Sequence, residues 1–264
     1  MNKIKTIIRK EWAEIFKNRM VIFTVAFLPL IMTAIPLGML FAMRGSASSS
    51  GMESLPAEAA AAMSCPEGLS GGECFQAYLV SQFMMLFMLI PAAIPMTIAA
   101  YSIVGEKTTR SLEPLLATPI TTFELLMGKC LAAVIPAILA TFAAFGIFAG
   151  GAWLVVENKL LLSAIFDARW QLAIFAVGPL MALLAVVVGL MVSSRVNDPR
   201  VAEQISIVII MPVLVGFFGQ IAGWFVLNAA IIAWVAVILL FLDALLFYLG
   251  VGVFQREAIL TRWK

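Results

Sequence analysis

The sequence contains no histidine, and only 12% of its 264 residues are charged. Without an imidazole, Ser–His hydrolysis and His-bound zinc are excluded, and three cysteines are too few for a four-thiolate metal site or an iron–sulfur cluster. No segment reads Gly-x-x-x-x-Gly-Lys-Ser/Thr, the phosphate-binding loop of many ATPases, and no nucleophile–base set is visible. We expect a protein that is no enzyme by itself, holds no cofactor and has no nucleic acid partner.

Hydrophobic residues are abundant instead and make up 63% of the chain. A helix of about 20 apolar residues crosses the hydrocarbon core of a bilayer. The pattern predicts an all-α membrane protein of one domain, residues 1–264, with six transmembrane helices; a count of five would need one very long last helix. The helices are expected at residues 20–43, 77–103, 131–156 and 172–192, with two more in residues 205–254 divided near residues 219–228.

Lys and Arg residues are distributed unevenly between the loops of this arrangement. Fourteen of them lie on the side that holds both termini, and three lie on the other side. Short cytoplasmic loops of membrane proteins are enriched in Lys and Arg. We therefore expect both termini in the cytoplasm and the protein in the plasma (inner) membrane.

The N-terminal segment, residues 1–19, is amphipathic. Helical spacing places Ile4, Ile8, Trp12 and Ile15 on one face, and the lysines lie largely elsewhere. This pattern predicts a short helix in the cytoplasmic lipid interface. A basic anchor that only sets the topology is a compatible interpretation.

The first external loop, residues 44–75, holds Cys65 and Cys74. On the oxidising side of the membrane these cysteines are expected to form a disulfide, with two free thiols as the alternative. Cys130 is expected to be an inert, small hydrophobic residue. A second external segment, residues 157–170, is amphipathic and is expected to rest on the outer interface.

The cytoplasmic region between the second and third membrane helices, residues 104–129, has the most informative pattern. Leu112, Leu115 and Leu116 lie at i, i+3 and i+4 and form one apolar face of a short helix, which ends at Pro119. An apolar face outside the membrane needs a surface to pack on. The N-terminal helix, the lipid interface or a partner protein can supply it.

The start of the following helix is also predictable. Thr121 or Thr122 can cap it, with Glu124 in its first turn. This helix leads into the third membrane crossing.

The same region resembles the membrane subunits of the ABC-2 family, the permeases of ATP-binding-cassette exporters. The shared pattern is an acidic residue, a Ser-Leu-Glu-x-Leu-Leu core, a Thr-Pro-Ile step and Gly-Lys at the next membrane entry. In this sequence these are Glu106, residues 111–116, residues 118–120 and Gly128-Lys129. Residues 9–19, 198–212 and 254–264 are similar to further stretches of the family, in the same order. Within the family, the sodium-exporter-like branch is the most similar.

The resemblance implies a mode of action. Such permeases form a homodimer, or pair with a similar permease, and join two copies of a separate subunit that binds ATP and Mg²⁺. The cytoplasmic region is then a coupling helix that sits in a groove of the ATPase. The residues expected at this contact are Glu106, Arg110, Leu112, Glu113, Leu115, Leu116 and Pro119.

Three polar side chains are predicted within the membrane helices: Asp243, Gln82 and Gln220. An ionisable group at this depth is a functional candidate by default, so Asp243 is either a cation or proton site or a carboxyl bonded to a neighbouring helix. The two glutamines either line a pathway or bond across helices. The main alternative function is an ATP-independent carrier or channel that uses Asp243 as its ion or proton site.

Overall fold

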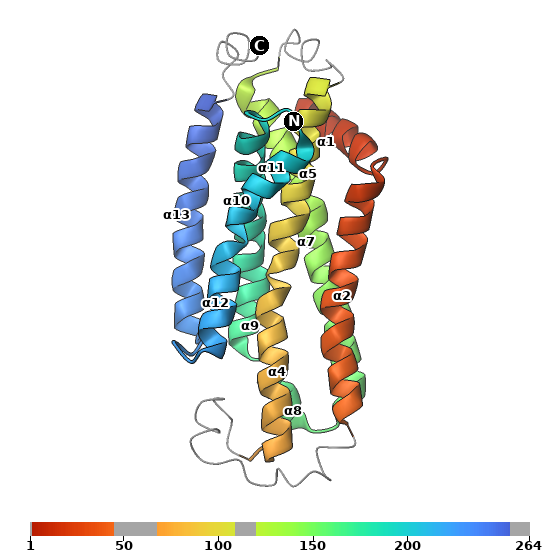
Figure 1. The fold of residues 1–264 in the computed structure, drawn as a ribbon, viewed down its shortest axis with the longest axis vertical. Helices are drawn as coiled ribbons and strands as arrows, with labels where there is room; N and C mark the ends of the chain where they lie inside the picture. The colour runs from red at the N-terminus through yellow and green to blue at the C-terminus, as the bar shows by residue number, and fades with distance from the viewer. Residues whose placement is uncertain (1, 45–67, 109–119, 254–264) are drawn as a thin grey trace.

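The computed structural model describes residues 2–44, 68–108 and 120–253, and every regular element within them is helical. Long helices run side by side in an elongated bundle, with α1 at one end and α8 at the other (Figure 1). The elements are α1 (Asn2–Ile15), α2 (Arg19–Met43), α4 (Gly71–Phe87), α5 (Leu89–Thr108), α7 (Thr122–Val155), α8 (Lys159–Ile165), α9 (Ala168–Leu172), the π-helical η1 (Ala173–Val177), α10 (Gly178–Ser193), α11 (Pro199–Ser206), the 3₁₀ turn η2 (Ile207–Ile209), α12 (Met211–Ile221) and α13 (Ala229–Val253).

Among the described residues, five helical stretches are long and apolar enough to cross a membrane. These are Val21–Met43, Gly71–Glu106, Thr122–Val155, Lys159–Ser193 and Ala229–Gly252. A bent pair, Pro199–Ile209 and Met211–Ile221, makes a sixth if it is one span; its halves differ in direction by 42°. The all-helical prediction is confirmed, and the six predicted crossings match the upper count.

The predicted break near residues 219–228 falls between the end of α12 and the start of α13. Gly223 in this turn has a φ of 73°, a left-handed conformation that costs glycine no steric strain. The turn therefore separates the last two helices where the sequence indicated.

The helices differ in how far they are buried. In the Gly71–Glu106 stretch 72% of the most apolar window is buried, whereas the first and last spans are 17% buried. The centre is the contact of α5 with α10, where a Cβ on Gly189 would lie 3.0 Å from the Cβ of Ala99. A pair of small residues thus lets these two backbones approach closely, and α2 and α13 lie at the periphery.

The start of α7 confirms the predicted cap. Thr121 Oγ1 accepts from the backbone N–H of Glu124 at 3.2 Å, and Glu124 Oε2 accepts from the N–H of Thr121 at 2.9 Å. Reciprocal bonds of this kind satisfy two donors that a helix start leaves unpaired. They fix the beginning of α7 nine residues before the predicted membrane entry at residue 131.

Helix α1 packs on the protein. Trp12 Nε1 donates to the carbonyl of Ala132 in α7 at 2.9 Å, and Ile7 covers Gly128, where a Cβ would lie 2.8 Å from Ile7 Cγ2. Ile15 is buried as well. The apolar side that we expected to rest in lipid is thus largely turned toward α7, because a backbone without a side chain at Gly128 offers it a close fit.

Polar contacts join several elements at the end that holds α8. Asn158 Nδ2 donates to Glu73 Oε1 at 2.7 Å, and Arg44 pairs with Glu157. Cys74 at the start of α4 is disulfide-bonded. Its expected partner Cys65 lies outside the described residues, so their pairing stays a prediction.

Candidate functional site

Of the seven residues expected to contact a partner ATPase, only Glu106 lies in the described part of the chain. The side chain of Glu106 is 1% exposed and points into the bundle from the last turns of α5. Helix α1 covers Glu106, so its side chain is not on the surface, and its expected role at the ATPase contact stays a prediction. The other six residues, Arg110, Leu112, Glu113, Leu115, Leu116 and Pro119, lie outside the described residues.

Glu106 instead belongs to a network that we call the ion cluster: Lys10 and Glu11 of α1, Ser102 and Glu106 of α5, and Lys129 of α7. Lys129 Nζ lies 2.7 Å from Glu11 Oε1 and 2.8 Å from Glu106 Oε2. It also donates to Ser102 Oγ at 2.9 Å, and Ser102 Oγ donates to Glu11 Oε2 at 2.6 Å. Lys10 Nζ reaches Glu106 Oε1 from the solvent side, at 2.5 Å.

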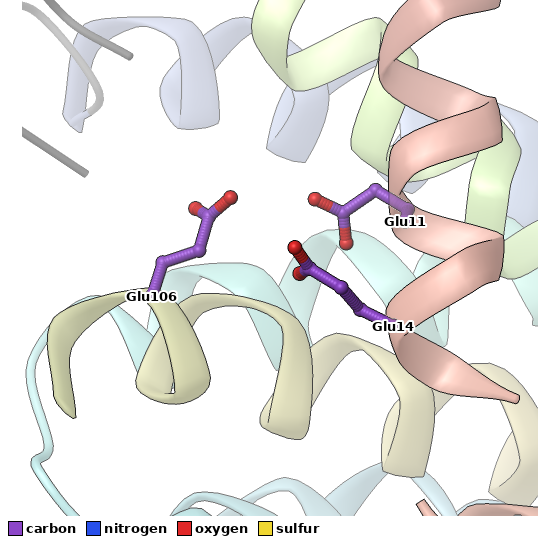
Figure 2. A group of neighbouring side chains, drawn as sticks. All are labelled: Glu11, Glu14 and Glu106. Atoms are coloured by element: carbon purple, nitrogen blue, oxygen red, sulfur yellow. The ribbon is translucent and has the colours of Figure 1, made fainter. Parts of the chain in front are cut away.

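Three carboxylates, those of Glu11, Glu14 and Glu106, approach one another from α1 and α5 (Figure 2). Their nearest oxygens lie within 4.8 Å of one another, a spacing that can suit a metal ion. Two ammonium groups, however, already form ion pairs with these carboxylates. Lys129 binds Glu11 and Glu106, and Lys10 binds Glu106 and lies 3.7 Å from Glu14. The arrangement is an ion-pair network between helices.

Burial decides how strongly the ion cluster constrains the fold. Side chains of Lys129, Glu11 and Glu106 are each 2% exposed or less. Taking a charge out of water costs several kcal/mol, which close partners must offset. Each of these groups has an opposite charge within 2.8 Å, so the cluster is satisfied only while α1, α5 and α7 keep one mutual position.

Glu11 and Lys129 lie in two stretches that are similar to the ABC-2 family, residues 9–19 and Gly128-Lys129, but no pattern in the sequence predicted their contact. One signal was available for each residue. Glu11 falls on the face of α1 that also holds Ile7 and Ile15, and Lys129 is a lone cation in an apolar helix of 34 residues. A charge on an otherwise buried face indicates a buried partner.

Gln82 and Gln220 lie across the contact between α4 and α12. The two helices are antiparallel (Figure 1), and Gly216 of α12 faces the end of the Met85 side chain of α4, where a Cβ would lie 2.4 Å from Cε. Gln220 follows Gly216 by one turn and Gln82 precedes Met85 by about one turn, so both glutamines lie at one level. Within the described residues, both amide atoms of Gln82 and Oε1 of Gln220 are buried without a hydrogen-bond partner.

Asp243 lies apart from the two glutamines, on α13, which packs chiefly against α10. It is 2% exposed, and neither carboxyl oxygen has a hydrogen-bond partner in the described part of the protein. One further carboxylate, which no sequence pattern singled out, bonds to a helix of the bundle. Glu203 of α11 accepts from Thr97 Oγ1 in the middle of α5 at 2.7 Å.

The described residues thus form a bundle of helices long enough to span a membrane, with a buried charge network between three of them. The family model described as ABC-2 family transporter protein matches residues 5–249. The chain therefore belongs to the ABC-2 family and is a multi-pass transporter permease; permeases of this family do not hydrolyse ATP themselves. None of the curated proteins matches the chain.

The ion cluster generates a stability prediction. Lys129→Met leaves Glu11 and Glu106 buried without their shared cation, and breaking a buried pair in this way costs about 3–5 kcal/mol. We expect a clear drop in the midpoint of thermal unfolding of the protein in detergent.

Two further variants control this experiment. Lys159→Gln removes an exposed charge at the other end and is expected to leave the midpoint unchanged. The triple variant Glu11→Gln, Glu106→Gln, Lys129→Met is expected to regain most of the loss, because no charge then stays uncompensated. If the single variant Lys129→Met were as stable as the natural protein, the predicted contribution of the ion cluster to stability would be wrong.

The register of α4 and α12 is testable by cross-linking. With Cys130→Ala as background, the pair Gln82→Cys and Gln220→Cys is expected to form a disulfide on mild oxidation, detected by mass spectrometry of the joined peptides. Val215 lies on the exposed side of α12. Gln82→Cys with Val215→Cys is therefore expected to stay unlinked, and equal yields from both pairs would refute the register.

Proposed function

We propose that this permease is the membrane part of an exporter driven by two copies of a separate ATP-binding subunit, which hold the ATP and Mg²⁺. In this proposal the permease works as a homodimer or with a similar permease in the plasma (inner) membrane, and its termini are cytoplasmic. The sodium-exporter-like branch is the part of the family that we propose for it. The end of the bundle that holds α1 then faces the ATPase.

The observation that supports this proposal is the position of the ion cluster. Helix α5 ends at Thr108 and α7 begins at Thr122, so these two helices flank the proposed coupling segment, residues 109–119. Glu106 and Lys129, close to the two ends of that segment, bind each other at 2.8 Å. A force on the segment would therefore move α5 and α7 together.

The cluster extends this unit to α1, because Lys129 also binds Glu11. Closure of an ATPase dimer would then displace three helices as one rigid body. Side chains in an ion network have few alternative positions, and this suits a contact that transmits motion rather than absorbing it.

Two contacts can pass this motion to the rest of the bundle. Helix α5 is packed closely on α10 at Gly189, and Thr97 of α5 donates to Glu203 of α11 at 2.7 Å. Helix α11 continues through the 42° bend into α12. We propose that the contact of α12 with α4 opens in response, and that Gln82 and Gln220 line the pathway there.

A second candidate function rests on Asp243. A carboxyl that is 2% exposed and unpaired among the described residues is expensive in a membrane and is a functional candidate on that ground. An ATP-independent carrier would use it as an ion or proton site. The family to which the chain belongs favours the ATP-driven permease.

The coupling segment supplies the test of the proposed function. Leu112→Glu with Leu115→Glu places two charges on the apolar face of the proposed coupling helix, and we expect the cognate ATP-binding subunit to be lost from the tagged permease during mild purification. The variant itself is expected in the membrane in normal amount. Leu112→Met with Leu115→Met keeps the apolar face and serves as the matched control; full recovery of the ATPase with the Glu variant would refute the coupling role.

Asp243→Asn separates the two candidate functions. Asparagine keeps the size of the side chain but removes its ability to carry charge, so the carrier mechanism predicts complete loss of transport. Under the ATP-driven mechanism we expect ATP-dependent transport by the reconstituted complex to continue within about threefold of the natural rate, roughly 0.7 kcal/mol in activation free energy.

A further inference from the structure

Helix α1 has a second face, directed away from the ion cluster. Lys5 and Arg9 lie one turn apart on it and are exposed, and the exposed Phe16 continues the same stripe. Lys17 and Arg19 follow where the chain passes from α1 into α2, and both are exposed. We call Lys5, Arg9, Lys17 and Arg19 the basic border.

The basic border has no counter-charge in the described part of the protein. None of its four cations is within ion-pair distance of a carboxylate there, whereas two other lysines of the same helix have partners. Lys3 lies 3.6 Å from Glu124, and Lys10 binds Glu106. Within the described ranges, the lysines that face other helices are thus neutralised and the outer cations are unpaired.

The level of the basic border in the membrane follows from α2. The span Val21–Met43 is only 17% buried, and Ile22, Phe23 and Phe27 on its first turns are exposed apolar side chains. A helix of this kind faces lipid from its first turn. Lys17 and Arg19 directly precede it and so lie at the level of the phospholipid headgroups, with α1 running obliquely across the end of the bundle (Figure 1).

We propose that the basic border binds the phosphate headgroups of anionic phospholipids, and that this contact sets the position of α1. Clusters of Lys and Arg next to a membrane helix attract anionic lipid. The occupant follows from charge complementarity and from continuity with the lipid-facing surface of α2. An acidic surface of the ATP-binding subunit is the other possible occupant and is distinguished by the test below.

The function of such a contact follows from the two faces of α1. Lipid holds the outer face, and Glu11 on the inner face binds Lys129, which binds Glu106 next to the proposed coupling segment. Anionic lipid would therefore strengthen the coupling of ATP hydrolysis to the permease. This second step depends on the proposed function, whereas the lipid contact does not.

Binding of phosphatidylglycerol to the full chain tests the first step. Native mass spectrometry of the detergent-purified permease, titrated with phosphatidylglycerol or with phosphatidylcholine, gives the two apparent Kd values. We expect tighter binding of phosphatidylglycerol, and Lys5→Gln with Arg9→Gln is expected to weaken it about tenfold. Both residues are exposed and unpaired among the described residues, so the double variant is expected to fold normally.

A charge-matched control is available at the same end of the bundle. Arg195, between α10 and α11, and Arg200, in the first turn of α11, are exposed and also lack an ion pair among the described residues. Arg195→Gln with Arg200→Gln also removes two positive charges, but at a site away from α2. This variant is expected to bind phosphatidylglycerol with a Kd within about twofold of that of the natural protein. Equal losses from both pairs, or no loss from the Lys5 and Arg9 pair, would overturn the proposed site.

The second step is measured with the ATPase complex in nanodiscs. Replacing a third of the phosphatidylcholine by phosphatidylglycerol is expected to raise ATP hydrolysis by the natural complex at least twofold and to have no effect on the Lys5 and Arg9 variant. If that variant instead loses the ATPase subunit in lipid-free detergent and keeps its affinity for phosphatidylglycerol, the basic border is a protein contact and the lipid proposal is wrong. Failure of the Leu112 and Leu115 test would leave the lipid titration interpretable.

Discussion

One buried lysine between two carboxylates determines how three helices of this protein fit together. Lys129 reaches Glu11 and Glu106 within 2.8 Å, and among residues 2–44, 68–108 and 120–253 neither carboxylate has a second cation that is equally buried. Apolar residues of similar volume would hold the helices at a lower desolvation cost, so the value of the charges lies in the single geometry that satisfies them. The position of α5 in turn sets that of α10, through Ala99 and Gly189, and brings Thr97 to Glu203.

Local patterns in the sequence were sufficient for the membrane spans and one helix cap but not for this network. The membrane helices follow from apolar length, and the Thr121–Glu124 cap from an i, i+3 relation. Glu11 and Lys129 are 118 positions apart, and their contact exists only because α1 folds back over α7. The burial of Glu106 was missed for the same reason: a carboxylate just beyond a membrane helix is solvated by default, and no local signal showed that another helix covers it.

The same limit applies to the polar groups inside the membrane. Gln82, Gln220 and Asp243 were identifiable as residue types in apolar runs, but composition does not tell which of them share a contact. The contact of Gly216 with Met85 places the two glutamines at one level of the α4–α12 contact, and Asp243 belongs to a different pair of helices. Which polar groups share a contact thus depends on how the helices pack, and the buried centre of the bundle contrasts with a periphery that is mostly exposed.

The length of α7 has a consequence for the bilayer that surrounds the protein. Its 34 residues measure about 51 Å, against a hydrocarbon core of about 30 Å. Trp153, 69% exposed near one end, is an aromatic anchor of the kind found at membrane interfaces, and Lys129 lies about 36 Å from it along the helix axis. The ion cluster is thus just outside the hydrocarbon. Longer acyl chains would thicken the hydrocarbon core until it reached these charges. The protein can respond by reducing the tilt of α7 or by thinning the lipid around it. A change in membrane thickness therefore acts on the orientation of α1, α5 and α7, the helices that the ion cluster joins.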